Sequence, residues 1–250
     1  MTMARSYIGL SGYSYKAWQG PGRFYPDGLK QPQFLSYYAQ RYETVELDGT
    51  WYRMPSAEMV RAWTAHTPDG FLFAPKAHRQ VTHLRRLKPE ALESLRVMID
   101  RLAPLAAVGR LGPILLQLPP NLRRDDERLD AFLSGVPKDL RWAMEFRHAS
   151  WNVAEVEALL RTHRVAWVAA ETDETLAERR DTAAFRYARL RRSAYDEGAL
   201  REWARWCQEA VVAGKDCFVF LKHEDEGAPW IWADRLVEFT KTLSHGANGT

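Results

Sequence analysis

Charged side chains recur where short apolar segments of this sequence end. Glu46 ends one such segment, Lys76 another, and Glu145 with Arg147 a third. Two carboxylates such as Glu46 and Glu145 can serve as general acid and base when burial separates their pKa values. Lys76, Arg147 and Arg189 are suited to holding negative charge on a substrate. These residue types indicate acid–base chemistry on a polar or anionic small molecule, or on a nucleotide-like ligand.

The apolar segments are predicted β-strands, because each is short and rich in β-branched or aromatic residues. Eight of them follow one another, at residues 7–11, 44–47, 70–76, 112–118, 141–146, 165–170, 185–190 and 217–221. Helical patterns lie between them, except that only the segment TDETLAERRDTA separates the sixth strand from the seventh. That spacing predicts a sixth helix that is short or missing.

Eight strands alternating with helices in 250 residues predict the α/β class and a single (β/α)₈ TIM-type barrel of parallel strands. A doubly wound sheet is disfavoured, because the turn GLSGYSYKAWQG after the first strand is not GxGxxG. No linker divides the chain, so one domain is predicted over residues 1–250, with a frayed carboxyl terminus from about residue 244. In such a barrel, polar residues at strand carboxyl ends line the mouth where active sites lie.

Several residues predict where helices begin or break. Ser56 is suited to an N-cap, Asp125 and Asp126 are expected to open the helix that runs DERLDAFLSG, and Ser150 is expected to cap the helix that follows it. Gly198 is expected to lie just before the helix that starts ALREW. Pro104 is predicted to kink or split a long helix.

Composition narrows the class of protein. Two cysteines exclude a disulfide scaffold and a four-cysteine zinc site. No apolar run approaches the length of a signal peptide core or of a membrane span, which predicts a cytoplasmic protein. Lys and Arg number 35 against 32 Asp and Glu, and the net charge of +3 by itself names no nucleic-acid partner.

The charged cluster has a structural alternative and a metal-binding alternative. In the first, its acids and bases pair with one another as an ion network inside the barrel mouth. In the second, Glu46, Glu145 and Glu171 with a histidine bind Mg²⁺ or Mn²⁺. No HxH or HxxxH spacing occurs among the seven histidines, so neither a metal site nor another cofactor is predicted.

Basic residues also recur in the segments that follow the predicted strands. They are Arg79, Arg85, Arg86, Lys88, Arg123, Arg124, Arg179, Arg180, Arg191 and Arg192. A basic rim of this kind, with Trp51 or Tyr13 stacking on bases, suits a nucleic-acid-binding protein, which is the second functional hypothesis. Acidic residues are interleaved among them, so only weak, non-specific binding is expected. A non-catalytic barrel that binds a protein partner is the third hypothesis.

Five segments, in this order, resemble the YecE-like family, also called domain of unknown function family 72. They are GLSGYSYKAWQG, TVELDGTWYRMP, FLFAPKAHRQVTH, ILLQLPP and AMEFRHASW, and the resemblance runs from about residue 7 to residue 235. It implies a TIM-type barrel without a settled activity. Many members read something like INSTFY where this chain has LDGTWY, and YFNND where it has FLKHED.

The resemblance and the strand ends together give one set of candidate site residues. The family pattern carries over onto Ser11, Gly12, Glu46, Tyr52, Lys76, His83, Gln117, Glu145, Arg147, His148, Trp151 and Arg189. Glu145 is the first candidate for acid–base work and Glu46 the second, and the others, apart from Gly12, are predicted to bind substrate. His148 has a second interpretation as a capping or helix-packing residue. Trp18, Trp51 and Trp151 follow strand ends and are expected near a ligand.

Overall fold

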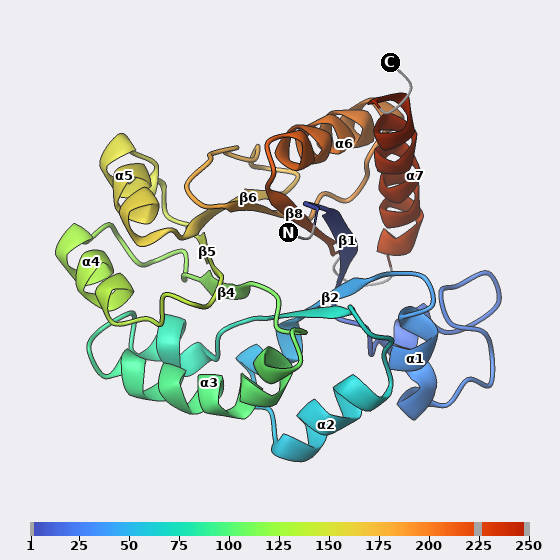
Figure 1. The fold of residues 1–250 in the computed structure, drawn as a ribbon, viewed down its shortest axis with the longest axis horizontal. Coiled ribbons are helices and arrows are strands. Elements are labelled where there is room, and N and C mark those ends of the chain that lie inside the picture. The colour runs from blue at the N-terminus through green and yellow to red at the C-terminus, as the bar shows by residue number, and fades with distance from the viewer. Residues whose placement is uncertain (1–2, 223–226, 248–250) are drawn as a thin grey trace. The chain divides into compact units, whose positions relative to one another are not determined.

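The computed structural model describes residues 3–222 and 227–247. All eight expected strands are present, with small shifts at their ends (Figure 1). They are β1 (Ser6–Ser11), β2 (Thr44–Leu47), β3 (Leu72–Pro75), β4 (Ile114–Gln117), β5 (Trp142–Glu145), β6 (Ala166–Glu171), β7 (Phe185–Leu190) and β8 (Asp216–Leu221). The second half of the motif FLKHED, and the end of the terminus predicted to fray, lie outside the described residues.

Helices follow most of the strands. They are α1 (Phe34–Tyr38), α2 (Ala57–Ala65), α3 (Ala91–Ala107), α4 (Asp126–Ser134), α5 (Ala154–His163), α6 (Glu197–Val212) and α7 (Pro229–Ala247). Residues 172–184 form no helix between β6 and β7, which confirms the prediction for the sixth unit. Over the described ranges, no helix has both the length and the apolar character needed to cross a membrane.

The strands form one parallel sheet in the order β3-β2-β1-β8-β7-β6-β5-β4. Its two end strands, β3 and β4, are joined by parallel bridges that pair Phe73 with Leu111 and Lys76 with Leu115. The strand order therefore closes on itself. This is the topology of a TIM-type (β/α)₈ barrel, and the predicted fold class is confirmed.

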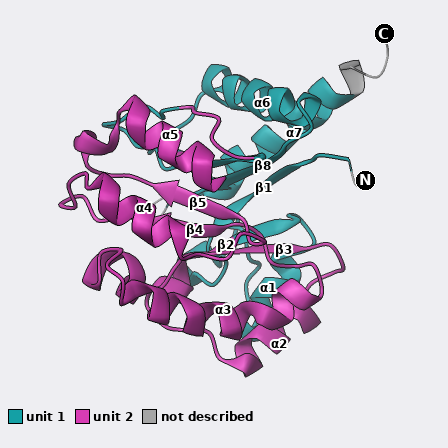
Figure 2. Cartoon of the chain, turned by 60° about the vertical axis from the view of Figure 1, so that its left-hand side comes forward, with its two compact units in different colours: residues 1–45, 169–178, 184–250 teal, residues 46–168, 179–183 magenta. Residues whose placement is uncertain are grey.

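The chain divides into two compact units (Figure 2). Unit 1 comprises residues 1–45, 169–178 and 184–250, and unit 2 comprises residues 46–168 and 179–183. The single domain expected from the sequence stays a prediction. Lys76, Gln117, Glu145 and Arg147 all belong to unit 2.

The core of unit 1 depends on one close backbone approach. A Cβ added at Gly9 in β1 would lie 2.2 Å from the carbonyl oxygen of Thr44. The buried hydroxyl of Tyr38 donates to the same oxygen at 2.9 Å and accepts the backbone N–H of Leu10 at 2.7 Å. Only glycine leaves room for this contact, which ties α1 and β1 to the start of β2.

Helix ends were predicted with mixed success. The side chains of Ser56 and Asp125 accept backbone N–H groups at the starts of α2 and α4, as expected for N-caps. Ser150 was wrong as a cap, because α5 begins only after Val153 and the Ser150 hydroxyl instead accepts the backbone N–H of Arg124.

Two further expectations about helices need correction. Gly198 lies inside α6 rather than before it, because the side chain of Asp196 caps that helix two residues earlier. Pro104 does not split its helix, since α3 continues through it to Ala107.

Candidate functional site

The centre of the site is the carboxylate of Glu145, the last residue of β5. Glu145 and the last residue of β4, Gln117, are register partners, and only 2% and 3% of their surfaces are exposed. The amide of Gln117 donates to Oε1 of Glu145 at 2.8 Å. Both strands place three apolar residues before this polar pair, so the sequence itself sets an amide beside a carboxylate at their carboxyl ends.

Arg147 gives the buried carboxylate a cationic partner. Its Nε–H donates to the same Oε1 of Glu145 at 3.0 Å, and its side chain remains 34% exposed. Two residues apart on an extended backbone, the side chains share one face, as the strand period predicts. The pair favours the ionised carboxylate, because a charge-assisted hydrogen bond compensates part of its desolvation. An ionised carboxylate is the form that can accept a proton.

Lys76 and Trp51 form the next layer of the site. Trp51 ends a 3₁₀ turn, Asp48–Trp51, that follows β2, and the Nζ of Lys76 lies 5.1 Å from its ring centroid. The hydroxyl of Thr50 lies 2.6 Å from the carbonyl oxygens of both Leu47 and Lys76, so the turn after β2 is fastened to the end of β3. The ammonium group is thereby held over an aromatic face.

His83 lies beside Trp51 on a π-helical turn, Gln80–Leu84. The indole N–H of Trp51 donates to Nδ1 of His83 at 3.3 Å, and the two rings meet at 83°. Burial, together with the neighbouring charges of Lys76, Arg147 and Arg86, lowers the pKa of His83 to about 4, while the carboxylate of Glu145 acts in the opposite direction. The imidazole ring of His83 is therefore neutral at pH 7, and its pKa depends on all of these groups.

The lowered pKa of His83 predicts a pH dependence of stability. In the unfolded chain a histidine titrates near pH 6.5, so between about 6.5 and about 4 the unfolded state binds the extra proton and the folded state does not. The contribution of His83 is therefore fully present above about pH 6.5 and is lost as the pH falls toward about 4. Urea unfolding at several pH values in this range should show that the free energy of unfolding changes less with pH in His83→Gln than in the wild type. An identical pH dependence in the two proteins would contradict the prediction.

Two other predicted site residues of unit 2, Glu46 and Tyr52, differ in their exposure. Glu46, in β2, is completely buried. Tyr52 is 68% exposed and its ring meets that of Trp51 edge-on, with the centroids 4.6 Å apart. Its exposed face is free for a planar group, so Tyr52 stays a candidate for contact with a ligand.

His148 and Trp151 have structural tasks. Nδ1 of His148 accepts the backbone N–H of Ser150 at 3.1 Å, which is the capping interpretation of that histidine. Trp151 is 1% exposed, its indole N–H donates to the carbonyl of Leu122, and its ring stacks on Phe146. Trp18 is likewise buried. Ligand contact by these two tryptophans stays a prediction.

Unit 1 contributes the remaining candidates. Ser11 is the last residue of β1, and Arg189 is the penultimate residue of β7. Both are buried, at 1% and 2% exposure. Glu171 ends β6 and accepts the indole N–H of Trp203 at 3.0 Å, a contact between a strand and the helix α6. That contact gives Glu171 a structural role in unit 1.

Metal ligands do not gather in the part of the chain that the structure describes. Over residues 3–222 and 227–247, no three side chains of His, Cys, Asp or Glu are arranged to hold a metal ion. The cluster around Glu145 instead combines one carboxylate with an amide, a neutral imidazole and cations. This donor set suits proton transfer and anion binding.

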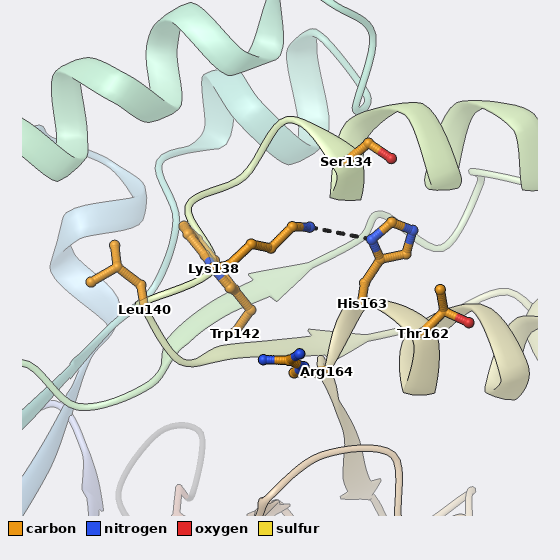
Figure 3. A pocket seen from close by; sticks show the side chains of 7 residues that line it. All are labelled: Ser134, Lys138, Leu140, Trp142, Thr162, His163 and Arg164. Atoms are coloured by element: carbon orange, nitrogen blue, oxygen red, sulfur yellow. Dashed lines mark hydrogen bonds between the residues drawn. The ribbon is translucent and has the colours of Figure 1, made fainter.

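A hollow of about 350 Å³ lies elsewhere in unit 2, between the ends of α4 and α5 (Figure 3). Its lining is Ser134, Lys138, Leu140, Trp142, Thr162, His163 and Arg164. Lys138 donates to the last-turn carbonyl of Leu133 and lies 3.3 Å from Nδ1 of His163, whose Nε2 meets Asp130. Lys138 thus binds a carbonyl group at the carboxyl end of α4. Trp142 begins β5, so the hollow lies at the strand end opposite Glu145.

Sequence reasoning missed the contacts that position the site. It proposed Trp51 as a stacking surface, whereas its N–H binds His83, 32 residues away along the chain. It did not consider Thr50 or Thr82, whose hydroxyls bind the turn and the imidazole. A threonine directly after Gly49 or before a histidine has no distinctive pattern, so no signal in the sequence marks either residue.

The matches to known proteins agree with this topology. The family described as "Protein of unknown function DUF72" matches residues 7–247. The UPF0759 protein YecE of Escherichia coli K12 is 30% identical over 143 residues, which is 57% of this chain and 48% of that protein. The chain spans about half the length of the curated relatives it matches.

Solved structures extend the comparison. A DUF72 family protein from Thermotoga maritima is 28% identical, with a TM-score of 0.76 and coverage of 96% of this chain and 99% of that one. A xylose isomerase domain protein from Alicyclobacillus acidocaldarius, 14% identical with a TM-score of 0.52 over 98% of this chain and all of that one, shows a shared fold alone. The barrel topology and a match across nearly the whole sequence lead to one conclusion: this chain belongs to the DUF72 family, as the order of its motifs predicted.

Proposed function

We propose that the protein is an acid–base enzyme that acts on a small anionic substrate at the carboxyl ends of the strands of unit 2. The observation that carries this proposal is the arrangement around Glu145. The buried carboxylate of Glu145 is fixed by Gln117 and Arg147. Its charge and that of Lys76 both affect the pKa of the neutral imidazole of His83. Structural packing does not require these five groups to converge, whereas proton transfer beside an anion does.

Each residue has a distinct task in this proposal. Glu145 accepts and returns a proton, and Gln117 fixes the orientation of its carboxylate. Arg147 and Lys76 attract the negative group of the substrate, Arg147 through its exposed part and Lys76 through its ammonium group. Tyr52 presents an exposed ring beside them. Glu46, Ser11 and Arg189 stay predictions as contributors to the same chemistry.

Anion binding tests the proposal directly. Inorganic phosphate, glycolate and a panel of sugar phosphates and 2-oxo acids would be titrated by calorimetry into the wild type. The tightest ligand should bind about 10- to 100-fold more weakly to Lys76→Met, because a charge-assisted contact is lost. Lys138→Met is the matched control, since it removes a lysine of the same unit that lies away from Glu145. Unchanged binding to Lys76→Met, or no binding of any anion to the wild type, would contradict the proposal.

The contacts of several arginines in the basic rim weaken the hypothesis of a nucleic-acid-binding protein. Arg124 forms hydrogen bonds with Asp126, whose pKa it lowers, and Arg85 donates to a carbonyl and approaches Glu93 at 3.8 Å. Arg180 pairs with Glu157. Phosphates would have to compete with these partners.

A prediction follows for DNA. The double variant Arg123→Ala, Arg124→Ala should change the affinity for single-stranded DNA little, and the wild type should bind only in the non-specific range of about 10⁻⁴ to 10⁻⁶ M at physiological salt. Fluorescence anisotropy at several salt concentrations would measure both affinity and salt slope. Tight binding that collapses in the double variant would instead support a nucleic-acid-binding protein.

A further inference from the structure

The contacts of His83 determine which ring nitrogen carries its proton. The indole nitrogen of a tryptophan can only donate a hydrogen bond, and that of Trp51 donates to Nδ1 of His83 at 3.3 Å. The hydroxyl of Thr82 lies 2.9 Å from the same nitrogen. Nδ1 must therefore be the unprotonated acceptor. In the neutral ring the hydrogen then sits on Nε2.

Protonation of His83 is opposed from several sides. An imidazolium ring would place a second N–H on Nδ1, directly against the N–H of Trp51. Its charge would also face those of Lys76, Arg147 and Arg86, with the carboxylate of Glu145 as the one opposing group among the charges that act on it. The result is a neutral imidazole whose Nε2–H is fixed in direction.

We propose that His83 is a neutral electrophile, whose Nε2–H donates to a substrate oxygen on which negative charge develops, with Trp51 as the residue that positions it. A neutral donor stabilises an oxyanion without delivering a proton too early. Lys76 and Glu145 supply a cation and a base around the same ring. This inference rests on the proposed function and names its reaction class: proton transfer at a carbon next to a carbonyl group.

The step balances without a cofactor or oxidant. The carboxylate of Glu145 takes a proton from the carbon beside the carbonyl, and the C–H electron pair becomes a carbon–carbon double bond. The carbonyl π pair moves to oxygen, where the Nε2–H of His83 and the ammonium of Lys76 stabilise the enolate. The proton then returns from Glu145 to carbon. A return to the neighbouring carbon isomerises a hydroxycarbonyl substrate, with a second proton moving between its oxygens.

The substrate class is therefore a small anion that carries a carbonyl group with an adjacent C–H. Sugar phosphates and hydroxylated 2-oxo acids have this chemistry. Their anionic group would lie with Arg147 and Lys76, and their carbonyl oxygen with His83.

Nitrogen NMR tests the tautomer without any substrate. In ¹⁵N-labelled protein at pH 7, the ring signals of His83 are those that disappear in His83→Gln. We expect a protonated Nε2 and an unprotonated Nδ1 in the wild type. Trp51→Phe keeps an aromatic ring but removes the N–H, so it should yield a mixture of both tautomers. Tyr52→Phe is the matched control and should retain the single tautomer. A protonated Nδ1 in the wild type, or a single unchanged tautomer in Trp51→Phe, would overturn the inference.

Solvent exchange tests the chemistry. The panel of sugar phosphates and 2-oxo acids would be incubated with the protein in D₂O, and deuterium uptake beside the carbonyl followed by proton NMR. One member should exchange, and His83→Gln should slow that exchange by about 10²- to 10³-fold.

The outcomes separate the two ideas. Anions that bind through Lys76 but never exchange would overturn this inference and leave the proposed function standing. Absence of any anion binding would remove the proposed function itself, whichever tautomer His83 has.

Discussion

Replacing Glu145 with glutamine should abolish proton transfer while lowering the free energy of unfolding by only about 1.5 to 3 kcal/mol, the range for losing a hydrogen bond to a charged group. The substitution keeps the size of the side chain and a polar partner for Gln117. The cation it leaves behind, Arg147, is 34% exposed and stays hydrated. Urea unfolding and the deuterium exchange assay would be run on the same preparations.

The opposite half of the pair should be more costly to remove. Arg147→Met removes a charged donor from a carboxylate that is 2% exposed, and breaking a buried pair in this way costs about 3 to 5 kcal/mol. Glu145→Gln should therefore be the milder of the two changes. If the order were reversed, or if Glu145→Gln lost several kcal/mol and kept full activity, the pair would be a structural ion bridge rather than a catalytic centre.

Gly9→Ala should prevent unit 1 from folding or lower its stability by several kcal/mol. The added Cβ would lie 2.2 Å from the carbonyl oxygen of Thr44 and 2.9 Å from the hydroxyl of Tyr38. A backbone atom cannot rotate away as a side chain can, so β1 would have to shift and break the hydrogen bonds that Tyr38 forms.

The control is a glycine with space around it. A Cβ at Gly49 would meet no atom within 4 Å, and its backbone is not in the left-handed region. Gly49→Ala should therefore leave the melting temperature nearly unchanged or raise it slightly. A wild-type-like melt for Gly9→Ala would contradict the close approach of Thr44.

The strands were predictable because their signal is local. Runs such as ILLQ and WAME are short, mostly apolar and buried on both faces, so their own residues are enough to predict a strand. The N-cap Ser56 and the helix start at Asp125 and Asp126 were predictable for the same reason. The prediction for Ser150 was wrong because its hydroxyl accepts the backbone N–H of Arg124, a tertiary contact that no local pattern reveals.

The site was predictable only in part. Gln117, Glu145 and Arg147 could be placed together because strand period and parallel register determine which side chains meet. The contact of Trp51 with His83 could not, since it depends on a π-helical turn. That turn is followed by Arg86 and Leu87 in the left-handed region, where non-glycine residues are uncommon. No pattern in the sequence predicts the π-helical turn or these two backbone conformations.

The join between β3 and β4 gives the barrel a line along which it can open. Strands β7 and β8 pair over six residues each, whereas β3 and β4 meet through two isolated bridges and a few backbone bonds, such as that from Ala77 to Leu115 at 2.8 Å. Transient local unfolding requires less free energy at a short ladder than at a long one. The amide of Ala77 should thus exchange with solvent earlier than those of β8. Lys76 lies on this line, so each opening would swing its ammonium group away while the strands that hold Gln117 and Glu145 stay paired.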